Sequence, residues 1–197
     1  MLQYFDALCI GGAKIDIFLS LSSKNPYVHL DKKTNSLNLA YGQKIPAENC
    51  SLMLGGNAAN AAVGLSRLQI KTALMAELGK DEFSQKIING LMSEKVNSDF
   101  LLQNSNNPSS FSVILSFQEE RIILGQHVQR DHNFPFKGIS AKWVYLTSLG
   151  NKWEDAYLKA VQFVKQTGAK LAFNPGTLQL EKGYENIKNI LEATDIL

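Results

Sequence analysis

Short apolar segments alternate with helical patterns along most of the chain, and this alternation constrains the fold more than any other feature. Four apolar runs have the length of buried strands: 6–10, 72–78, 143–149 and 170–174. Amphipathic helical patterns occur at 57–68, 81–92, 153–167 and 184–192. Alternation of this kind predicts an α/β fold, in which a parallel sheet is covered by helices on both faces in three layers.

Two regions break this rhythm with antiparallel patterns. Residues 15–46 hold the alternating runs "IDIFLSL" and "SLNLAYGQKI" on either side of a polar loop, and residues 111–128 read as a hairpin with its turn near 118–120. Antiparallel strands do not fit within a parallel sheet, so we expect a small separate β lid. The expected core segments are about 1–14, 50–108 and 130–197, and the expected lid segments about 15–49 and 109–129.

The composition excludes several classes of protein. Of the 197 residues 20 are basic and 18 acidic, which gives a net charge of +2 without any block of like charge. Nucleic-acid binding and polybasic membrane anchoring are therefore not expected. No apolar run approaches the roughly 20 residues that span a bilayer, and the N-terminus lacks the basic start of a secretory signal. With only two cysteines, the chain is predicted to be cytoplasmic.

The stretch "LMLGGNAANAAVGLSRL" at 52–68 enters its helix through two glycines. Gly55 and Gly56 can adopt positive φ and leave no side chain between backbone and ligand. Asn57 is a good N-cap, Asn60 lies one turn further along the same face, and the first free N–H groups form a donor-rich site. Small residues let the helix lie close to the sheet: Ala58, Ala59, Ala61, Ala62 and Gly64. A plain Gly-Gly turn before a packed helix explains these residues about equally well.

The same stretch resembles a known family. "GGNAANAAVGLSRL" is similar to the first signature of the ribokinase-like, or PfkB, carbohydrate kinases, and "TALMAELGKDEFSQKIINGLMSEKVN" resembles the strand, the Gly-x-Asp turn at Gly79 and Asp81, and the helix that follow it. "IGGAKIDIF" places Asp16 where the family has its substrate-binding aspartate. The resemblance implies a parallel α/β core with a small β lid. It also implies phosphorylation of a sugar or nucleoside hydroxymethyl group, with ATP and Mg²⁺ as the cofactors of a complete enzyme.

The resemblance also implies roles for individual residues. Asp16 would accept hydrogen bonds from substrate hydroxyls beside the ring of Phe18, which shares its strand face. Gly55, Gly56 and Asn60 would hold further hydroxyls through backbone and amide groups. Asn174, in "FNPGT", ends a strand at the sheet edge where α/β proteins bind ligands, near substrate or nucleotide. For Asp16 the alternative is a solvated strand face, and for Asn174 a plain Asn-Pro-Gly turn.

Other polar residues carry weaker signals. His127, Asp131 and His132 in "HVQRDH" could be drawn as a metal site, but without a further ligand a polar segment after the hairpin explains them better. We therefore predict no metal ligands in this chain. Arg121 is interpreted as a solvated hairpin residue, and the aromatic rings at 153 and 157 as core packing at helical spacing.

Two departures from the family pattern bear on activity. Ser148, Leu149 and Gly150 stand where ribokinases carry a sugar-binding acid, which puts ribose in doubt. No Gly-Ala-Gly-Asp run occurs, so the aspartate base and the anion hole of the family are missing, and no catalytic residue is assigned. We expect a truncated frame or piece of a kinase that holds the substrate-binding and lid half, is inactive alone and binds neither ATP nor Mg²⁺ tightly. The alternatives are an inactive sugar-binding or dimerising remnant, with lid pairing to lid, and a half-protein completed by another chain.

Overall fold

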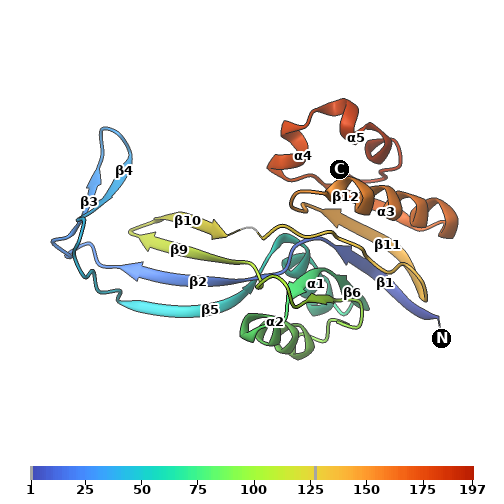
Figure 1. The fold of residues 1–197 in the computed structure, drawn as a ribbon, viewed down its shortest axis with the longest axis horizontal. Helices are drawn as coiled ribbons and strands as arrows, with labels where there is room; N and C mark the ends of the chain where they lie inside the picture. Colours follow the sequence, from blue (N-terminus) through green and yellow to red (C-terminus); the bar gives the residue numbers. More distant parts are fainter. Residues whose placement is uncertain (1, 127) are drawn as a thin grey trace. The chain divides into compact units, whose positions relative to one another are not determined.

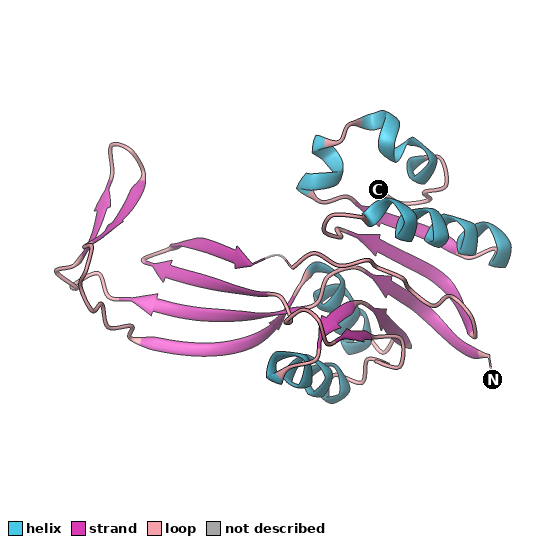
Figure 2. Ribbon diagram, viewed as in Figure 1, coloured by secondary structure: helices cyan, strands magenta, loops and turns pink. Residues whose placement is uncertain are grey.

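The computed structural model describes residues 2–126 and 128–197, which divide into two compact units. The first unit comprises the described residues within 1–15, 54–110 and 127–197, and the second comprises 16–53 and 111–126. Figures 1 and 2 show the elements of each unit. No helix in these described ranges is long and apolar enough to cross a membrane.

The first unit is built on a four-stranded sheet. Its strands, in the order β12-β11-β1-β6, are β12 (Lys170–Asn174), β11 (Ile139–Thr147), β1 (Gln3–Ile10) and β6 (Thr72–Met75). All three pairings are parallel, and Leu8 at the centre lies opposite Val144 on one side and Ala73 on the other. A second, two-stranded parallel ladder joins β7 (Glu77–Gly79) to β8 (Leu102–Asn104). The predicted parallel α/β architecture is confirmed.

Helices cover the sheet because its strands are apolar on both faces. The helices are α1 (Asn57–Arg67), α2 (Glu82–Ser93), α3 (Trp153–Thr167), α4 (Thr177–Glu181) and α5 (Tyr184–Leu191). Leu8 and Ile10 belong to the core cluster that includes the buried side chains of α3 and α5. Ala7 and Cys9 alternate with them and therefore face the other way, and α1 packs against β1 and β6.

Small and aromatic side chains set how closely the helices approach. Ala58, Ala59 and Ala62 of α1 are fully buried, as their size predicts, but Gly64 is exposed and plays no part in close packing. On α2, Ile87 and Leu91 are fully buried, whereas Met92 is 62% exposed. The rings at 153 and 157 are buried, with centroids 4.9 Å apart, which confirms their interpretation as core.

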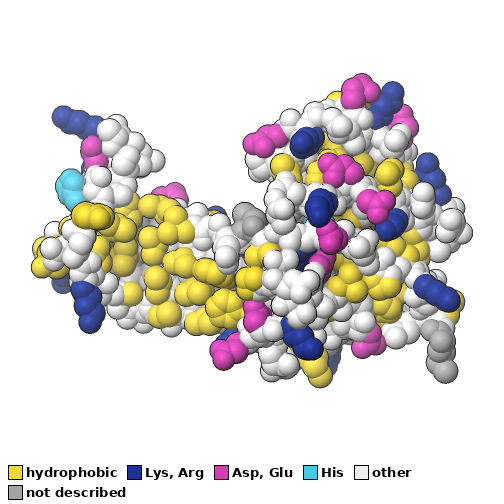
Figure 3. All heavy atoms as spheres, viewed as in Figure 1, with side chains coloured by type: hydrophobic (Ala, Val, Ile, Leu, Met, Phe, Trp, Pro, Cys, Tyr) yellow, Lys and Arg dark blue, Asp and Glu magenta, His cyan; other side chains and the backbone are white. Residues whose placement is uncertain are grey.

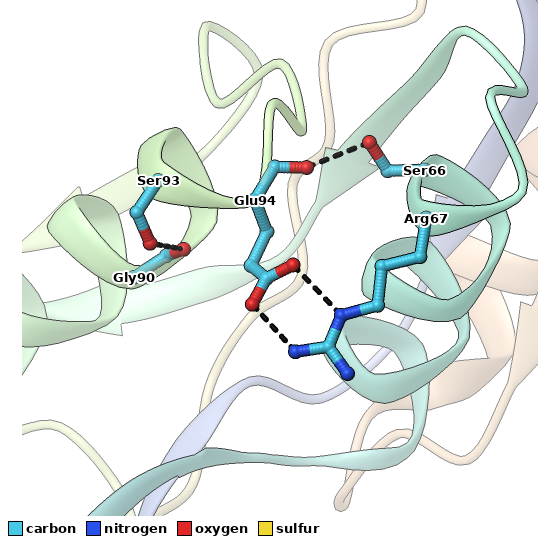
Figure 4. Close-up of polar contacts among 5 residues, drawn as sticks. All are labelled: Ser66, Arg67, Gly90, Ser93 and Glu94. Carbon is cyan, nitrogen blue, oxygen red and sulfur yellow. Dashed lines mark hydrogen bonds and ion pairs between the residues drawn. The ribbon is translucent and has the colours of Figure 1, made fainter.

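Helices α1 and α2 are joined at their C-terminal ends by polar contacts (Figure 4). Arg67 donates from Nε to Glu94 Oε2 at 2.8 Å and from Nη2 to Oε1 at 2.6 Å, and Ser66 Oγ donates to the Glu94 carbonyl at 2.7 Å. Within α2, Ser93 Oγ donates to the Gly90 carbonyl at 2.8 Å. The ion pair is exposed, so it fixes the orientation of the two helix ends more than it stabilises the fold.

The second unit is a sheet with a separate hairpin. The sheet has the order β10-β9-β2-β5, formed by β10 (Glu120–Gln126), β9 (Phe111–Phe117), β2 (Lys14–Leu21) and β5 (Asn49–Gly55), and the hairpin pairs β3 (Val28–Asp31) with β4 (Ser36–Leu39). β9 and β10 pair antiparallel, which confirms the predicted hairpin, and Gln118 in their turn has a φ of 55°. The segment expected to be a polar loop instead contains β3, β4 is shorter than expected, and β5 was not predicted.

Apolar side chains remain exposed on the second unit. Ile122, Ile123 and Leu124 of β10 are 38%, 53% and 55% exposed, and Leu52 and Met53 of β5 are exposed as well. Figure 3 shows apolar side chains spread over the visible face of this sheet. Because β5 and β10 are the two edge strands, these side chains border unpaired backbone groups.

Candidate functional site

A cavity of about 550 Å³ opens in the first unit at the carboxyl ends of its parallel strands. Four loops contribute: the one after β1, the entrance of α1, the one after β11 and the one between β12 and α4. Glu77 of β7, Ser110 and the segment that follows β10 also contribute. Its lining residues are Gly11–Lys14, Gly56, Asn57, Glu77, Ser110, Val128, Arg130, His132, Ser148–Asn151, Gly176–Gln179 and Glu181. Ligands of open parallel sheets bind at this edge, so the topology itself favours a binding site here.

Gly56 shapes the entrance of α1. Its φ of +98° lies in a region that favours glycine, and a Cβ there would lie 2.5 Å from the Gly12 carbonyl oxygen. The chain can therefore bring the first turn of α1 against the loop after β1, where the Ala59 N–H donates to the Gly12 carbonyl at 3.4 Å. N–H groups of a first helical turn lack intrahelical acceptors and attract oxygen ligands.

Asn57 does not cap α1 as predicted. The N-cap position belongs to Gly56, no side chain caps the helix, and Asn57 is the first helical residue. Because Gly56 adopts a positive φ, the chain turns into the helix at Gly56, one residue before the predicted cap. Asn57 Nδ2 instead donates to Ser148 Oγ at 2.9 Å, which ties the entrance of α1 to the loop after β11.

The other predicted site residues occupy different surroundings. Gly55 is buried directly before Gly56, whereas Asn60 is exposed on α1 and does not line the cavity. Asn174 ends β12, is exposed, and donates from Nδ2 to Tyr145 Oη at 3.2 Å. Asp16 and Phe18 lie on β2 in the second unit, and both are partly buried. The first unit thus brings Gly56 into the cavity with Asn57, which sequence analysis had assigned to capping.

The segment after β10 contains the three residues that the sequence alone could suggest as a metal site. His127 lies outside the described residues. Asp131 Oδ1 accepts a hydrogen bond from Lys152 Nζ at 2.5 Å, and this contact lowers the pKa of Asp131. Within 2–126 and 128–197 no three His, Cys, Asp or Glu side chains form a group that could hold a metal ion.

Sequence reasoning missed the buried polar wall of the cavity, formed by Glu77, Arg130 and His132. Arg130 and His132 are 6% and 5% exposed. The backbone N–H of His132 donates to Glu77 Oε2 at 2.9 Å, and its Nδ1 lies 3.9 Å from the same oxygen. Arg130 Nη2 donates to the Pro108 carbonyl at 2.6 Å. The only sequence signal was the mixture of charges in "HVQRDH", which gives no indication of burial.

Burial dominates the electrostatics of this wall. It lowers the pKa of His132, although Glu77 acts in the opposite direction, so the imidazole is neutral at pH 7. Burial also lowers the pKa of Arg130, while the negative charges of Glu77 and Asp81 favour its ionised form. A guanidinium remains charged at any ordinary pH. Arg130 therefore supplies the wall of the cavity with a permanently charged, buried donor.

Asp81 stabilises the polar wall indirectly, through the loop that contacts Arg130. It is the N-cap of α2, accepts from the Ser84 N–H at 2.9 Å, and takes part in a capping box with that serine. Its carboxylate also accepts from the Ser109 N–H at 2.6 Å and from Ser109 Oγ at 2.7 Å. Because Ser109 follows Pro108, whose carbonyl holds Arg130, the Gly-x-Asp turn fixes the loop that positions the guanidinium.

The sequence of the chain is similar to a known family of proteins. Residues 19–197 match the pfkB family of carbohydrate kinases. The 5-dehydro-2-deoxygluconokinase of Mesomycoplasma hyopneumoniae is 26% identical over 141 residues, which cover 64% of this chain and 42% of that protein. The chain therefore spans less than half the length of the curated relatives it matches.

Solved structures share the fold. A ribokinase of Arabidopsis thaliana in complex with ribose and ATP superposes with a TM-score of 0.68 at 18% identity, covering 98% of this chain and 59% of that one. A PfkB protein from Polaromonas sp. JS666 superposes with a TM-score of 0.72 at 15% identity, covering 97% of this chain and 64% of that one. The fold is therefore ribokinase-like.

Proposed function

The chain belongs to the pfkB family of carbohydrate kinases, and from this premise we propose that it binds the sugar or nucleoside whose hydroxymethyl group a complete enzyme phosphorylates with ATP. In this proposal the first unit is the substrate-binding part of the kinase core and the second unit is its lid. The chain matches longer proteins over part of their length, and we propose the full reaction only for a complete enzyme.

One observation carries this proposal. Gly56, held at φ +98° with no room for a side chain, brings the first turn of α1 and Asn57 to a cavity at the carboxyl edge of the sheet. Bare backbone donors, an amide and the Ser148 hydroxyl suit a ligand rich in hydroxyl groups, because each hydroxyl both donates and accepts. The family resemblance supports Asp16, Gly55 and Asn60 as further substrate contacts, with Phe18 and Asn174 nearby.

We propose that a nucleotide and metal centre is not formed by the described residues of this chain on their own. The sequence has no Gly-Ala-Gly-Asp run to supply the anion hole and the base, and the described residues offer no cluster that could hold Mg²⁺. ATP and Mg²⁺ would supply the phosphoryl group and its charge neutralisation in a complete enzyme. We therefore assign no phosphoryl-transfer step to these residues and propose that the chain alone is inactive.

Two further features bear on partners and location. The exposed edge strands β5 and β10, with Ile122, Ile123 and Leu124 beside them, support a proposal that the lid sheet pairs with a second copy. The catalytically inactive remnant and the half-protein completed by another chain remain the alternative proposals. Cys9 and Cys50 are free thiols, which supports a cytoplasmic location, where thiols stay reduced.

The first test is ligand binding by the purified chain. A sugar at 100 times its dissociation constant should stabilise the fold by about 2.7 kcal/mol, a rise of about 5–10 °C in melting temperature for a domain of this size. We expect such a shift from at least one member of a panel of pentoses, hexoses, sugar acids and nucleosides, and no sugar-dependent ADP release in a coupled assay. Turnover above a heat-killed control would show that another carboxylate acts as the base.

A second test addresses Asp16. Replacing Asp16 with asparagine should weaken binding of the sugar found in that panel by about 10- to 150-fold, because a charged acceptor at a bound hydroxyl is lost. The melting temperature without ligand should change little. Asp31→Asn, on β3 of the same unit, removes the same charge and serves as the control in calorimetric titrations. Equal affinity in the Asp16 and Asp31 variants would assign Asp16 to a solvated strand face.

A further inference from the structure

We propose that Arg130 forms a subsite for the carboxylate of an acidic sugar, so that this cavity prefers sugar acids over neutral sugars of the same length. The inference rests on the proposed function, because it names the substrate class of that site. It begins with a side chain that the sequence analysis passed over and that the sugar-binding residues of the family resemblance do not include.

The first step is the free donor of Arg130. The side chain lines the cavity and is 6% exposed, and its Nη2 is taken by the Pro108 carbonyl. Its Nη1 is buried and has no hydrogen-bond partner among the described residues. A buried charged donor without an acceptor is costly and uncommon in folded proteins. An acceptor supplied by the ligand in the cavity would satisfy it.

The second step is the rigidity of the segment that carries Arg130. Asp131 pairs with Lys152, and the next backbone N–H, of His132, donates to Glu77 at 2.9 Å. His132 has a φ of +51°, a conformation that non-glycine residues rarely adopt. Strained backbone held by several contacts is typical of functional sites. Arg130 is therefore held in place before any ligand arrives, which reduces the entropy lost on binding.

The third step is the charge around the guanidinium. Glu77 Oε2 accepts the His132 N–H, and the Asp81 carboxylate accepts from Ser84 and Ser109, so both carboxylates already hold other donors. They favour the ionised form of Arg130 without occupying Nη1. Glu181 also lines the cavity but is exposed, where water screens its charge.

The fourth step is the choice between a neutral and an anionic acceptor. A hydroxyl of a neutral sugar can accept from Nη1, but a bond between two ionised groups is roughly twice as strong as a neutral one. The planar guanidinium also matches a carboxylate better than an ammonium group does. His132, neutral beside Arg130, adds a ring that can donate to a carboxylate or accept from a hydroxyl.

The experiment compares ligands that differ only at one carbon. Calorimetric titration of the purified chain with D-gluconate and D-glucitol, and with D-ribonate and ribitol, measures the preference for the acid within each pair. We expect the acid of at least one pair to bind about 10- to 100-fold more tightly than its polyol at low salt. Arg130→Gln should reduce this ratio to within about threefold of unity. Arg67→Gln, which removes an exposed arginine outside the cavity lining, should leave the ratio unchanged.

Each outcome separates the subsite from the proposed function. Polyol and acid binding equally to the unmodified chain, or an acid preference that survives in Arg130→Gln, would overturn the subsite while sugar binding stands. Failure of every sugar, acid and nucleoside to bind would overturn the sugar-binding function together with the subsite. If melting curves show that Arg130→Gln is unfolded, Arg130→Lys keeps the charge but loses the planar fork. It should retain the Pro108 contact and lower the acid preference at least threefold, and an unchanged preference would contradict the proposal.

Discussion

Replacing Gly56 with alanine is expected to lower the free energy of unfolding by about 2–5 kcal/mol and to abolish sugar binding. Two costs add up at this position. An alanine would be held at φ +98°, where side chains are strained, and its Cβ would lie 2.5 Å from the Gly12 carbonyl oxygen and 2.8 Å from Ala13 Cα. Both neighbours are backbone atoms, which cannot turn aside as the end of a flexible side chain does. The chain would have to move the entrance of α1 away from the loop after β1.

Urea unfolding followed by circular dichroism measures the first effect, and the thermal shift with the bound sugar measures the second. Gly64→Ala is the matched control, because a Cβ at that exposed position of α1 would meet nothing within 4 Å. That variant should gain about 0.5–1 kcal/mol, since alanine favours the helix interior. If Gly56→Ala keeps both its stability and its sugar affinity, then the Gly-Gly stretch is an ordinary turn.

The sheet could be predicted because its strands are buried on both faces. Burial on both sides requires continuous apolar runs, and "ALCI" in β1 and "ALM" in β6 are such runs, with every residue buried. At one edge of the sheet, β12 alternates instead, with Leu171 and Phe173 buried and its two end residues exposed. The end of α3 also depends on a local residue, because Gly168 adopts φ +73° directly after the helix, a conformation that glycine favours. These features depend on local residues, so one sequence is enough to reveal them.

The second unit was harder to predict because its strands are only partly buried. β3, with "VHLD", and β5, with "NCSLMLG", both carry polar residues; β3 is mostly half-buried, and β5 is exposed along most of its length. Alternation is weak in such strands, and pairing with a neighbour distant in sequence decides their conformation. The polar loop predicted across β3 was wrong for this reason.

The polar wall of the cavity could not be predicted from the sequence, for a different reason. Arg130 and His132 are buried by elements far away in sequence, including the turn at Gly79 and Asp81 and the loop at Ser109. No pattern around "HVQRDH" indicates that a charged residue is buried, and arginine side chains are usually exposed. Likewise the N-cap prediction for Asn57 failed because the backbone of Gly56, constrained by Gly12, makes the turn itself.

The same dependence on distant contacts makes Asp81 the second position at which a large effect is expected. Asp81→Asn should lower the free energy of unfolding at pH 7 by about 2–4 kcal/mol, because an amide nitrogen cannot accept the hydrogen bonds that the carboxylate receives. Two of those donors, the N–H and hydroxyl of Ser109, belong to a residue that is 1% exposed. Their loss would free the loop whose Pro108 carbonyl holds Arg130, so the preference for sugar acids should fall as well.

Acid titration gives the sharper measurement, because it isolates the charge of Asp81. Partial burial raises the pKa of Asp81, but hydrogen bonds from Ser109 and Ser84 outweigh it, and the folded-state pKa lies below the ordinary value of 3.8. A lowered carboxyl pKa contributes stability that is complete above the unfolded pKa and is lost as the pH falls through the folded one. Stability of the unmodified chain should therefore decline below about pH 5, with a smaller decline in Asp81→Asn. Asp155→Asn, in an exposed pair with Lys159, should keep the steeper decline, and equal slopes in all three proteins would contradict this assignment.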